Sequence, residues 1–132
     1  DRLQPFADSG PVVIIVEGVL MYLDEARIRE LLRTLRLLFR RGEILCDVMT
    51  EEFANRFGRE IREKISELGA VFAIPSRPLE AIFAAEHYRQ TLQISVGRHR
   101  EALRLMPVMM ALAVRLMSGF KTGYTVRAFS PQ

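Results

Sequence analysis

An acidic residue and a tyrosine stand just after an apolar run that is predicted to be a buried strand. Glu17 directly follows Val12–Val16, Gly18 comes next, and Tyr22 lies five residues beyond Glu17. A carboxylate in this place is partly desolvated, so it requires a cation or a hydrogen-bond donor as its partner. Gly18 permits a backbone conformation or a close approach that other residues resist. The Tyr22 hydroxyl could face the same crevice, and this spacing is compatible with a ligand-binding site.

A structural interpretation of these residues is also open. Glu17 could cap backbone amides of the turn that follows the strand, and Tyr22 could be a packing residue whose hydroxyl reaches water. The spacing alone does not decide between the two interpretations.

The elements that must position these residues begin with a strand, a helix and a second strand. The continuous apolar run Val12–Val16 predicts a strand buried on both faces. Asp24 is predicted to cap a helix with one apolar face, and Gly42 is predicted to close it. Glu43–Met49 is predicted to be a second buried strand, parallel to the first and joined to it by a right-handed crossover.

The carboxyl ends of the two strands are the candidate site, because open parallel sheets bind ligands there. The first strand ends at Glu17 and Gly18, and the second ends in the segment Asp47–Thr50.

The rest of the chain completes an α/β layered domain. Near-alternation of polar and apolar residues in Tyr88–Val96 is typical of a strand that is antiparallel or near an edge. We predict one α/β domain over residues 1–132, with two parallel central strands, two C-terminal strands and flanking helices. The further elements predicted are helices at Thr50–Leu68, Leu79–Ala85 and Arg98–Ser118 and strands at Tyr88–Val96 and Gly123–Phe129.

Composition limits the classes of partner. The 132 residues are 49% hydrophobic and 27% charged, which is ordinary for a globular domain. The formal net charge is +3, and the arginines alternate with glutamates without interleaved aromatic residues, so we expect no nucleic-acid partner. The longest apolar stretch, Leu105–Met117, contains Pro107 and Arg115 and is too short to span a membrane.

The cysteine and histidine content argues against a metal site. One cysteine and two histidines are too few for the usual zinc ligand sets, so no metal is expected. The lone Cys46 lies in an apolar run, where a small buried side chain is expected. A single cysteine also fits a reducing cytoplasm, which is the expected location.

The segment Val16–Leu23, with the sequence VEGVLMYL, resembles the segment after the fourth strand in the leucine carboxyl methyltransferase family. This family includes the polyketide O-methyltransferases of the tetracenomycin type. The resemblance continues through the helix after Asp24 and into Ile44–Val48, which is similar to the family's fifth strand with its closing aspartate. It implies a class I, Rossmann-like methyltransferase fold that uses S-adenosylmethionine (SAM).

The resemblance also implies roles for the candidate residues. Glu17 matches the family glutamate that lies against the methionine part of the cofactor, and Gly18 accompanies it as a cofactor-binding residue. Tyr22 matches the family tyrosine near the site of methyl transfer. Asp47 could line the pocket of the methyl acceptor or accept amide hydrogen bonds at the start of a helix, and we favour the second. The acceptor is expected to be a small molecule with a carboxylate or a hydroxyl.

The family's glycine-rich loop is expected before residue 1, since the isolated glycines here form no G-x-G pattern. The chain is therefore interpreted as the C-terminal half of such an enzyme, inactive by itself. Its expected partners are the missing N-terminal half or a second copy, because the first strand needs neighbours on both edges. The alternative hypothesis is a non-catalytic α/β oligomerisation module derived from a methyltransferase scaffold.

Overall fold

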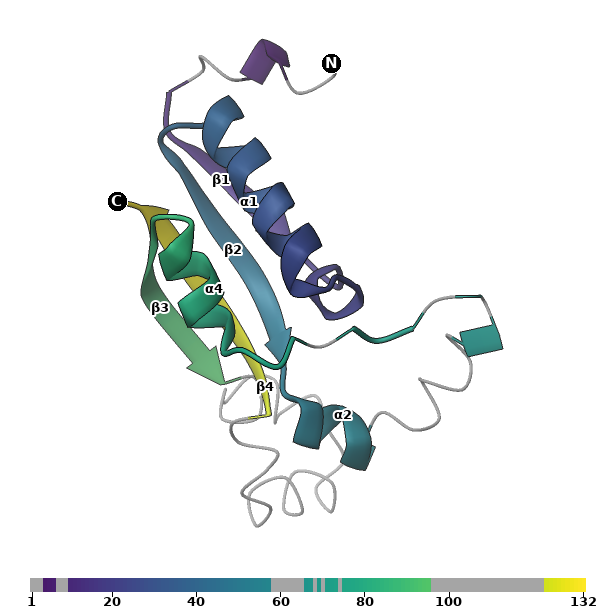
Figure 1. Ribbon diagram of the computed structural model, residues 1–132. Helices are drawn as coiled ribbons and strands as arrows, with labels where there is room; N and C mark the ends of the chain where they lie inside the picture. Colours follow the sequence, from purple (N-terminus) through teal and green to yellow (C-terminus); the bar gives the residue numbers. More distant parts are fainter. Residues whose placement is uncertain are drawn as a thin grey trace.

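The computed structural model of the chain describes residues 4–6, 10–57, 66–67, 69, 71–73, 75–95 and 123–132 (Figure 1). The expected helix over Arg98–Ser118 lies outside these residues. The strands are β1 (Val12–Val16), β2 (Gly42–Met49), β3 (Tyr88–Ser95) and β4 (Tyr124–Pro131). The helices are α1 (Glu25–Leu38), α2 (Glu51–Phe57) and α4 (Leu79–Ala85), with short 3-10 helices at Gln4–Phe6 and Leu20–Tyr22.

The described strands form one mixed sheet in the order β1-β2-β4-β3. β1 and β2 are parallel, with Ile14 opposite Ile44 and Val16 opposite Cys46. β4 runs antiparallel between β2 and β3, so β3 is an edge strand. The predicted α/β class, the parallel pair and the antiparallel edge strand are all confirmed.

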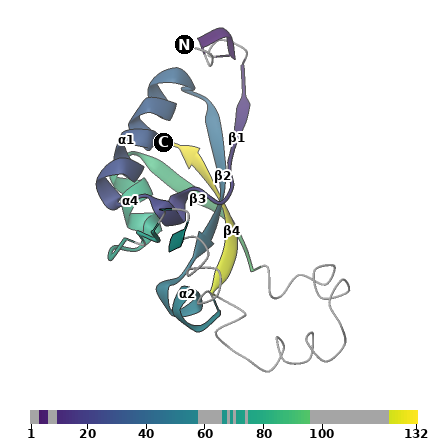
Figure 2. The same ribbon diagram turned by 90° about the vertical axis from the view of Figure 1, so that its right-hand side faces the viewer.

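Helices α1 and α4 pack on the same face of the sheet, as Figure 2 shows. On this face Phe83 of α4 stacks on Phe129 of β4, with ring centroids 3.9 Å apart, and Tyr88 meets Phe83 edge-on. The predicted apolar face of the first helix is confirmed, because its residues supply much of the core. The buried core consists of Val16, Leu20, Ile28, Leu32, Leu35, Phe39, Ile44, Cys46, Leu79, Ile82, Phe83, Tyr88 and Phe129.

β1 is buried on one face only, which corrects the expectation that both faces of Val12–Val16 are covered. Val16 is buried, whereas Val13 is 61% exposed and Ile15 is 69% exposed. β1 is an edge strand of the described sheet. Helices α1 and α4 both lie on the face of the sheet opposite to these exposed side chains. The side chains that alternate toward the other face therefore lack a covering helix among the described elements.

The first helix is capped as predicted and ends earlier than predicted. The main-chain nitrogen of Arg27 donates to Asp24 Oδ1 at 2.8 Å, which confirms the cap. The helix ends at Leu38, and Gly42 is the first residue of β2 rather than the helix end. A Cβ on Gly42 would lie 2.9 Å from the Phe39 Cβ and 3.0 Å from the Ile14 Cδ1. Close packing between helix and strand is thus the reason for this glycine.

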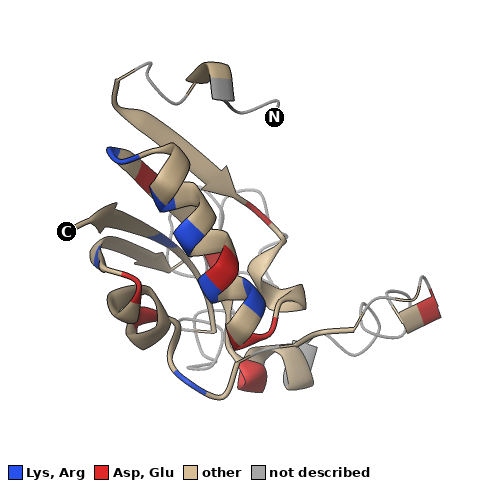
Figure 3. Cartoon of the chain, turned by 45° about the horizontal axis from the view of Figure 1, so that its top comes forward, with Lys and Arg blue, Asp and Glu red and all other residues tan. Residues whose placement is uncertain are grey.

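A buried carboxylate fastens α1 to the turn between α4 and β3. Glu86 accepts hydrogen bonds from Arg29 Nη1 at 2.8 Å and from Arg33 Nε at 2.9 Å. Arg36 Nη1 donates to the main-chain oxygens of Glu86 and His87. Figure 3 shows blue basic and red acidic segments interspersed along this helix. The arginines of this helix therefore hold the fold together as well as facing solvent.

The second helix begins where the sequence predicts. The main-chain nitrogen of Phe53 donates to Thr50 Oγ1 at 3.3 Å, so Thr50 caps α2. The described part of α2 ends at Phe57, and the rest of the predicted helix falls largely outside the described residues. Among the described helices, none is long and apolar enough to cross a membrane.

Candidate functional site

The candidate site lies where β1 and β2 end side by side. Because the two strands are parallel and in register from Val12 opposite Gly42 to Val16 opposite Cys46, their carboxyl ends meet at one edge of the sheet. Glu17 and Gly18 leave this edge from β1. Gly18 has a φ of +64°, a left-handed conformation that glycine adopts without strain.

Asp47 ties the two strand ends together. Its Oδ1 accepts a hydrogen bond of 2.8 Å from the main-chain nitrogen of Gly18. Its Oδ2 accepts a hydrogen bond of 2.7 Å from the hydroxyl of Tyr124, at the start of β4. The side chain is almost fully buried, and both of its oxygens have a donor. Asp47 does accept an amide hydrogen bond, but from the turn after β1 and not from a helix start, which corrects that part of the expectation.

Tyr124 belongs to the site although nothing in the sequence singled it out. It lies opposite Met49 in the antiparallel pairing of β2 with β4, and its ring stacks on Phe53 of α2 with centroids 6.0 Å apart. The contact with Asp47 spans 77 positions of the sequence. Predicting this contact from the sequence would require the order of the strands in the sheet, and local sequence patterns do not give that order.

Two carboxylates, those of Asp47 and Glu17, lie near this edge of the sheet and affect Tyr124. Burial raises the pKa of Tyr124, and the hydrogen bond and charge of Asp47 raise it further, as does the nearby charge of Glu17. Tyr124 therefore stays protonated and donates to Asp47. Glu17 itself is exposed and makes no hydrogen bond or ion pair with another residue of the described part. Its carboxylate is thus available to a cation.

Tyr22 is placed apart from this junction. It ends the 3-10 helix Leu20–Tyr22, is half-buried, and its ring stacks on Phe72 with centroids 5.3 Å apart and planes 13° from parallel. Its hydroxyl bonds no other residue of the described ranges. The structure therefore brings Glu17, Gly18 and Asp47 together and does not join Tyr22 to them.

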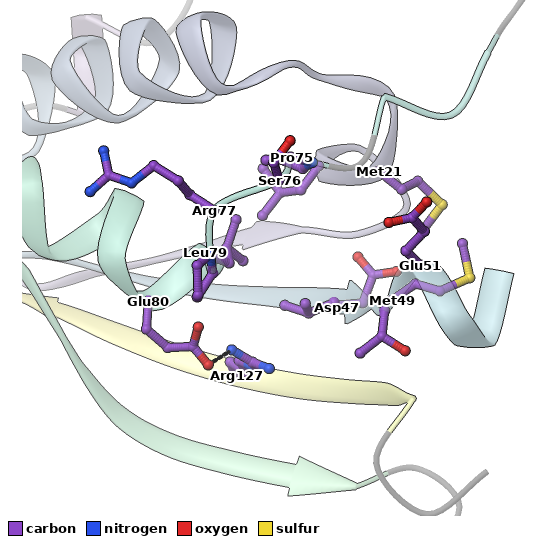
Figure 4. A pocket seen from close by; sticks show the side chains of 14 residues that line it. Met21, Asp47, Met49, Glu51, Pro75, Ser76, Arg77, Leu79, Glu80 and Arg127 are labelled. Carbon is purple, nitrogen blue, oxygen red and sulfur yellow. Dashed lines mark hydrogen bonds and ion pairs between the residues drawn. The ribbon is translucent and has the colours of Figure 1, made fainter. Parts of the chain in front are cut away.

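A pocket of about 410 Å³ opens beside Asp47, on the helix-covered face (Figure 4). This volume is in the range of about 300–1,000 Å³ that is usual for small-molecule sites. Asp47 is one of the residues that line the pocket. Gly18, Glu17 and Tyr22 do not line it. The lining residues are Leu20, Met21, Asp47, Val48, Met49, Thr50, Glu51, Pro75, Ser76, Arg77, Pro78, Leu79, Glu80 and Arg127.

One end of the pocket holds an ion pair. Arg127 of β4 donates from Nη1 to Glu80 of α4, and from Nε to Thr125 Oγ1 at 3.1 Å. In Figure 4 this pair lies at the end of the pocket away from Met21, Met49 and Glu51. Neither Arg127 nor Glu80 was singled out from the sequence, because an arginine in a strand and a glutamate in a helix's first turn are ordinary there.

Open space beside Gly18 suits the close approach of a ligand. A Cβ built on Gly18 would meet nothing within 4 Å. Glu17, next to it, has no hydrogen-bond partner among the described residues, so the turn offers an acidic group beside open space. These features suit a cationic group of a ligand.

Comparisons with solved structures show resemblance of fold. The duf574 family protein from Streptomyces avermitilis matches 100% of this chain and 53% of its own length, with a TM-score of 0.62 and 12% identity. LaPhzM matches 92% of this chain and 31% of its own, with a TM-score of 0.51 and 19% identity. Magnesium protoporphyrin IX methyltransferase (ChlM) from Synechocystis, with bound SAH, matches 96% of this chain and 48% of its own, with a TM-score of 0.48 and 11% identity.

No family model and no curated protein sequence matches the chain. The chain spans from about a third to about a half of the length of these solved structures. Its mixed α/β architecture therefore resembles a portion of the duf574 family protein.

Proposed function

We propose that this chain is the C-terminal portion of a SAM-dependent O-methyltransferase that methylates a carboxylate or hydroxyl of a small molecule. We assign it to the leucine carboxyl methyltransferase family on the resemblance of Val16–Leu23 and Ile44–Val48. The observation that carries the proposal is the bond between the Gly18 amide and Asp47, at the carboxyl ends of adjacent parallel strands. Ligands bind at such ends in open α/β sheets.

Each candidate residue has a role in this proposal. Glu17 binds the cofactor's ammonium group, and Gly18 leaves its backbone open to the cofactor. The resemblance assigns Tyr22 to the site of methyl transfer, although its side chain does not line the acceptor pocket. Asp47 holds the Gly18 turn in place and borders the acceptor pocket. SAM supplies an activated methyl group, so the chain's main contribution is alignment of the acceptor.

The test is calorimetric titration of SAM into the longer polypeptide that the proposal requires. Glu17→Ala should weaken SAM binding by about tenfold or more, because the ammonium loses a charged partner worth about 1.5–3 kcal/mol. Tyr22→Phe should leave SAM binding within about twofold and lower turnover. Glu52→Ala, which removes an exposed acidic residue from the first turn of α2 and outside the pocket lining, is the control for net charge.

Two outcomes would count against the proposal. If the Glu17→Ala variant bound SAM as tightly as the parent protein, Glu17 would have no role in binding the cofactor. Micromolar binding of SAM to the 132-residue chain alone would contradict the expectation that this portion holds only part of the cofactor site.

The second candidate function is a non-catalytic assembly module. The observation in its favour is the exposed face of β1, where Val13 and Ile15 are more than half exposed at an edge of the described sheet. A longer polypeptide that assembles but binds no SAM would support this alternative.

A further inference from the structure

We propose that the pocket beside Asp47 binds an apolar small molecule with one carboxylate, and that this carboxylate replaces Glu80 as the partner of Arg127. The inference deepens the proposed function, and rests on it only in taking this ligand to be the methyl acceptor. It concerns the anchoring of the ligand, and the anchoring carboxylate lies at the end of the pocket away from Met21, Met49 and Glu51.

Arg127 is a buried cation. Its side chain is 9% exposed, and it projects from β4 toward α4, as its ion pair with Glu80 shows. A guanidinium keeps its charge at any physiological pH, so a buried one requires an anionic or strongly polar partner. Thr125, itself 1% exposed, fixes the Nε end by accepting its hydrogen bond. Arg127 therefore cannot turn away to water.

Glu80 is placed differently. Its side chain is 43% exposed, it belongs to the first turn of α4, and Arg127 is its only hydrogen-bond partner among the described residues. An exposed carboxylate that turns into water recovers its hydration at little cost. The two partners of the ion pair therefore differ. Glu80 can turn into solvent, whereas Arg127 then requires another anion as its partner.

The carboxylate of a ligand can complete this exchange. It would present the same two oxygens to the guanidinium, which is a planar donor suited to carboxylates. No covalent bond is made or broken in the exchange. Arg127 exchanges one carboxylate for another and keeps an anionic partner throughout. A ligand without a carboxylate would have to leave the Arg127–Glu80 pair intact and would gain nothing from it.

The remaining pocket surface defines the body of the ligand. Leu20, Leu79, Pro75 and Pro78 are apolar, and the thioethers of Met21 and Met49 adapt to varied apolar shapes. Asp47 and Glu51 lie toward the end that holds these methionines (Figure 4). A second anionic group at that end would be repelled, so the pocket favours a monocarboxylate over a dicarboxylate.

The experiment uses 2-naphthoate as the probe, titrated into the protein and followed by its own fluorescence and by the NMR signal of the Arg127 Nε–H group. Glu80→Gln should bind 2-naphthoate at least about threefold more tightly, because the competing carboxylate is gone. Glu52→Gln makes the same change of charge at an exposed residue of α2 that does not line the pocket, and it should alter the affinity by less than about twofold. A merely structural ion pair predicts no such difference between the two variants.

Arg127→Gln should weaken 2-naphthoate binding by about tenfold or more. If Arg127→Gln does not fold, Arg127→Lys is the alternative variant, because it keeps the positive charge. It should bind 2-naphthoate more weakly than the parent protein, since it lacks the planar guanidinium that donates to both carboxylate oxygens. Equal affinity of Glu80→Gln and the parent, or equal affinity for 2-naphthol and 2-naphthoate, would overturn the inference. Failure of SAM binding would leave these titrations unaffected, so the two proposals fail separately.

Discussion

The carboxylate of Asp47 accepts the main-chain N–H of Gly18 with one oxygen and the hydroxyl of Tyr124 with the other. The side chain is 7% exposed. Water therefore cannot easily replace either hydrogen bond when its partner is removed. Asp47→Asn should lower the free energy of unfolding by about 1–3 kcal/mol, because an amide has one acceptor oxygen where two donors converge. Urea unfolding followed by circular dichroism measures this change.

The matched comparison uses two tyrosines. Tyr124→Phe should destabilise the chain, because it leaves one Asp47 oxygen without its donor. Tyr22→Phe should change the stability by less than about 0.5 kcal/mol, since its hydroxyl bonds no other described residue. Equal effects of the two tyrosine substitutions would show that the Asp47–Tyr124 bond contributes nothing.

Local patterns in the sequence predicted the parts of this fold that depend on neighbours in the chain. The cap at Asp24, the apolar face of α1 and the cap at Thr50 each rest on residues within a few positions of one another. The parallel pairing of β1 with β2 followed from the intervening helix, because such crossovers place parallel strands together.

Cys46 should be unreactive toward thiol reagents in the folded chain. Burial raises the pKa of its thiol to about 12, and the charge of Asp47 adds to the effect. The reactive thiolate is therefore scarce at pH 8, whereas an unfolded cysteine has a pKa of about 8.5. Labelling with a disulfide reagent at pH 8 should be slow in buffer and complete in guanidinium chloride. Rapid stoichiometric labelling of the native chain would contradict the buried placement.

Glu86 should make the fold sensitive to acid. Its hydrogen bond from Arg33, followed by that from Arg29, lowers the pKa of its carboxyl in the folded chain. The ionised form therefore stabilises the fold above the unfolded value of about 4.3, and this contribution is lost as the pH falls through the lower folded-state pKa. Glu86→Gln should cost about 1.5–3 kcal/mol near pH 7, with a difference that shrinks toward pH 3.

The control for this pH dependence is Glu30→Gln, which removes an exposed carboxylate from the same helix α1. Its effect should be less than about 0.5 kcal/mol at any pH. Denaturant titrations at several pH values compare the two variants. A constant difference between Glu86→Gln and the parent from pH 7 to pH 3 would exclude the proposed acid sensitivity.

The isolated chain should not be a monomer. β1 is an edge strand of the described sheet, and Val13 and Ile15 expose apolar surface beside its unpaired backbone. Such an edge pairs readily with another strand, and a charged side chain blocks the pairing. Light scattering at micromolar concentration should show an oligomer for the parent and a smaller species for Ile15→Lys.

Leu37→Lys is the matched control, because Leu37 is 83% exposed on helix α1 and the change is chemically similar. It should leave the oligomer intact. A monodisperse parent monomer would argue against the interpretation of β1 as a strand that requires a neighbour on each edge.

The features that the sequence did not predict depend on contacts between distant segments. The one-sided burial of β1 follows from the placement of α1 and α4 on one face of the sheet, and a run of β-branched residues has the same pattern whether one face or both faces are covered. The partnership of Asp47 with Tyr124, and that of Arg127 with Glu80, both require β4 to lie beside β2. The sequence likewise shows a glycine at position 42, but it does not show whether a turn or tight packing requires this glycine.

The position of β4 also bears on how the sheet is assembled. β2 and β3 are both paired with β4, and they are not paired with each other. Among the described strands β4 is the last to be synthesised, so β3 has no strand partner until residues 124–131 emerge. Pairings of such wide sequence separation form slowly. A growing chain must therefore hold β3 and α4 in place without the pairing to β4, and the described sheet becomes continuous only when β4 has joined it.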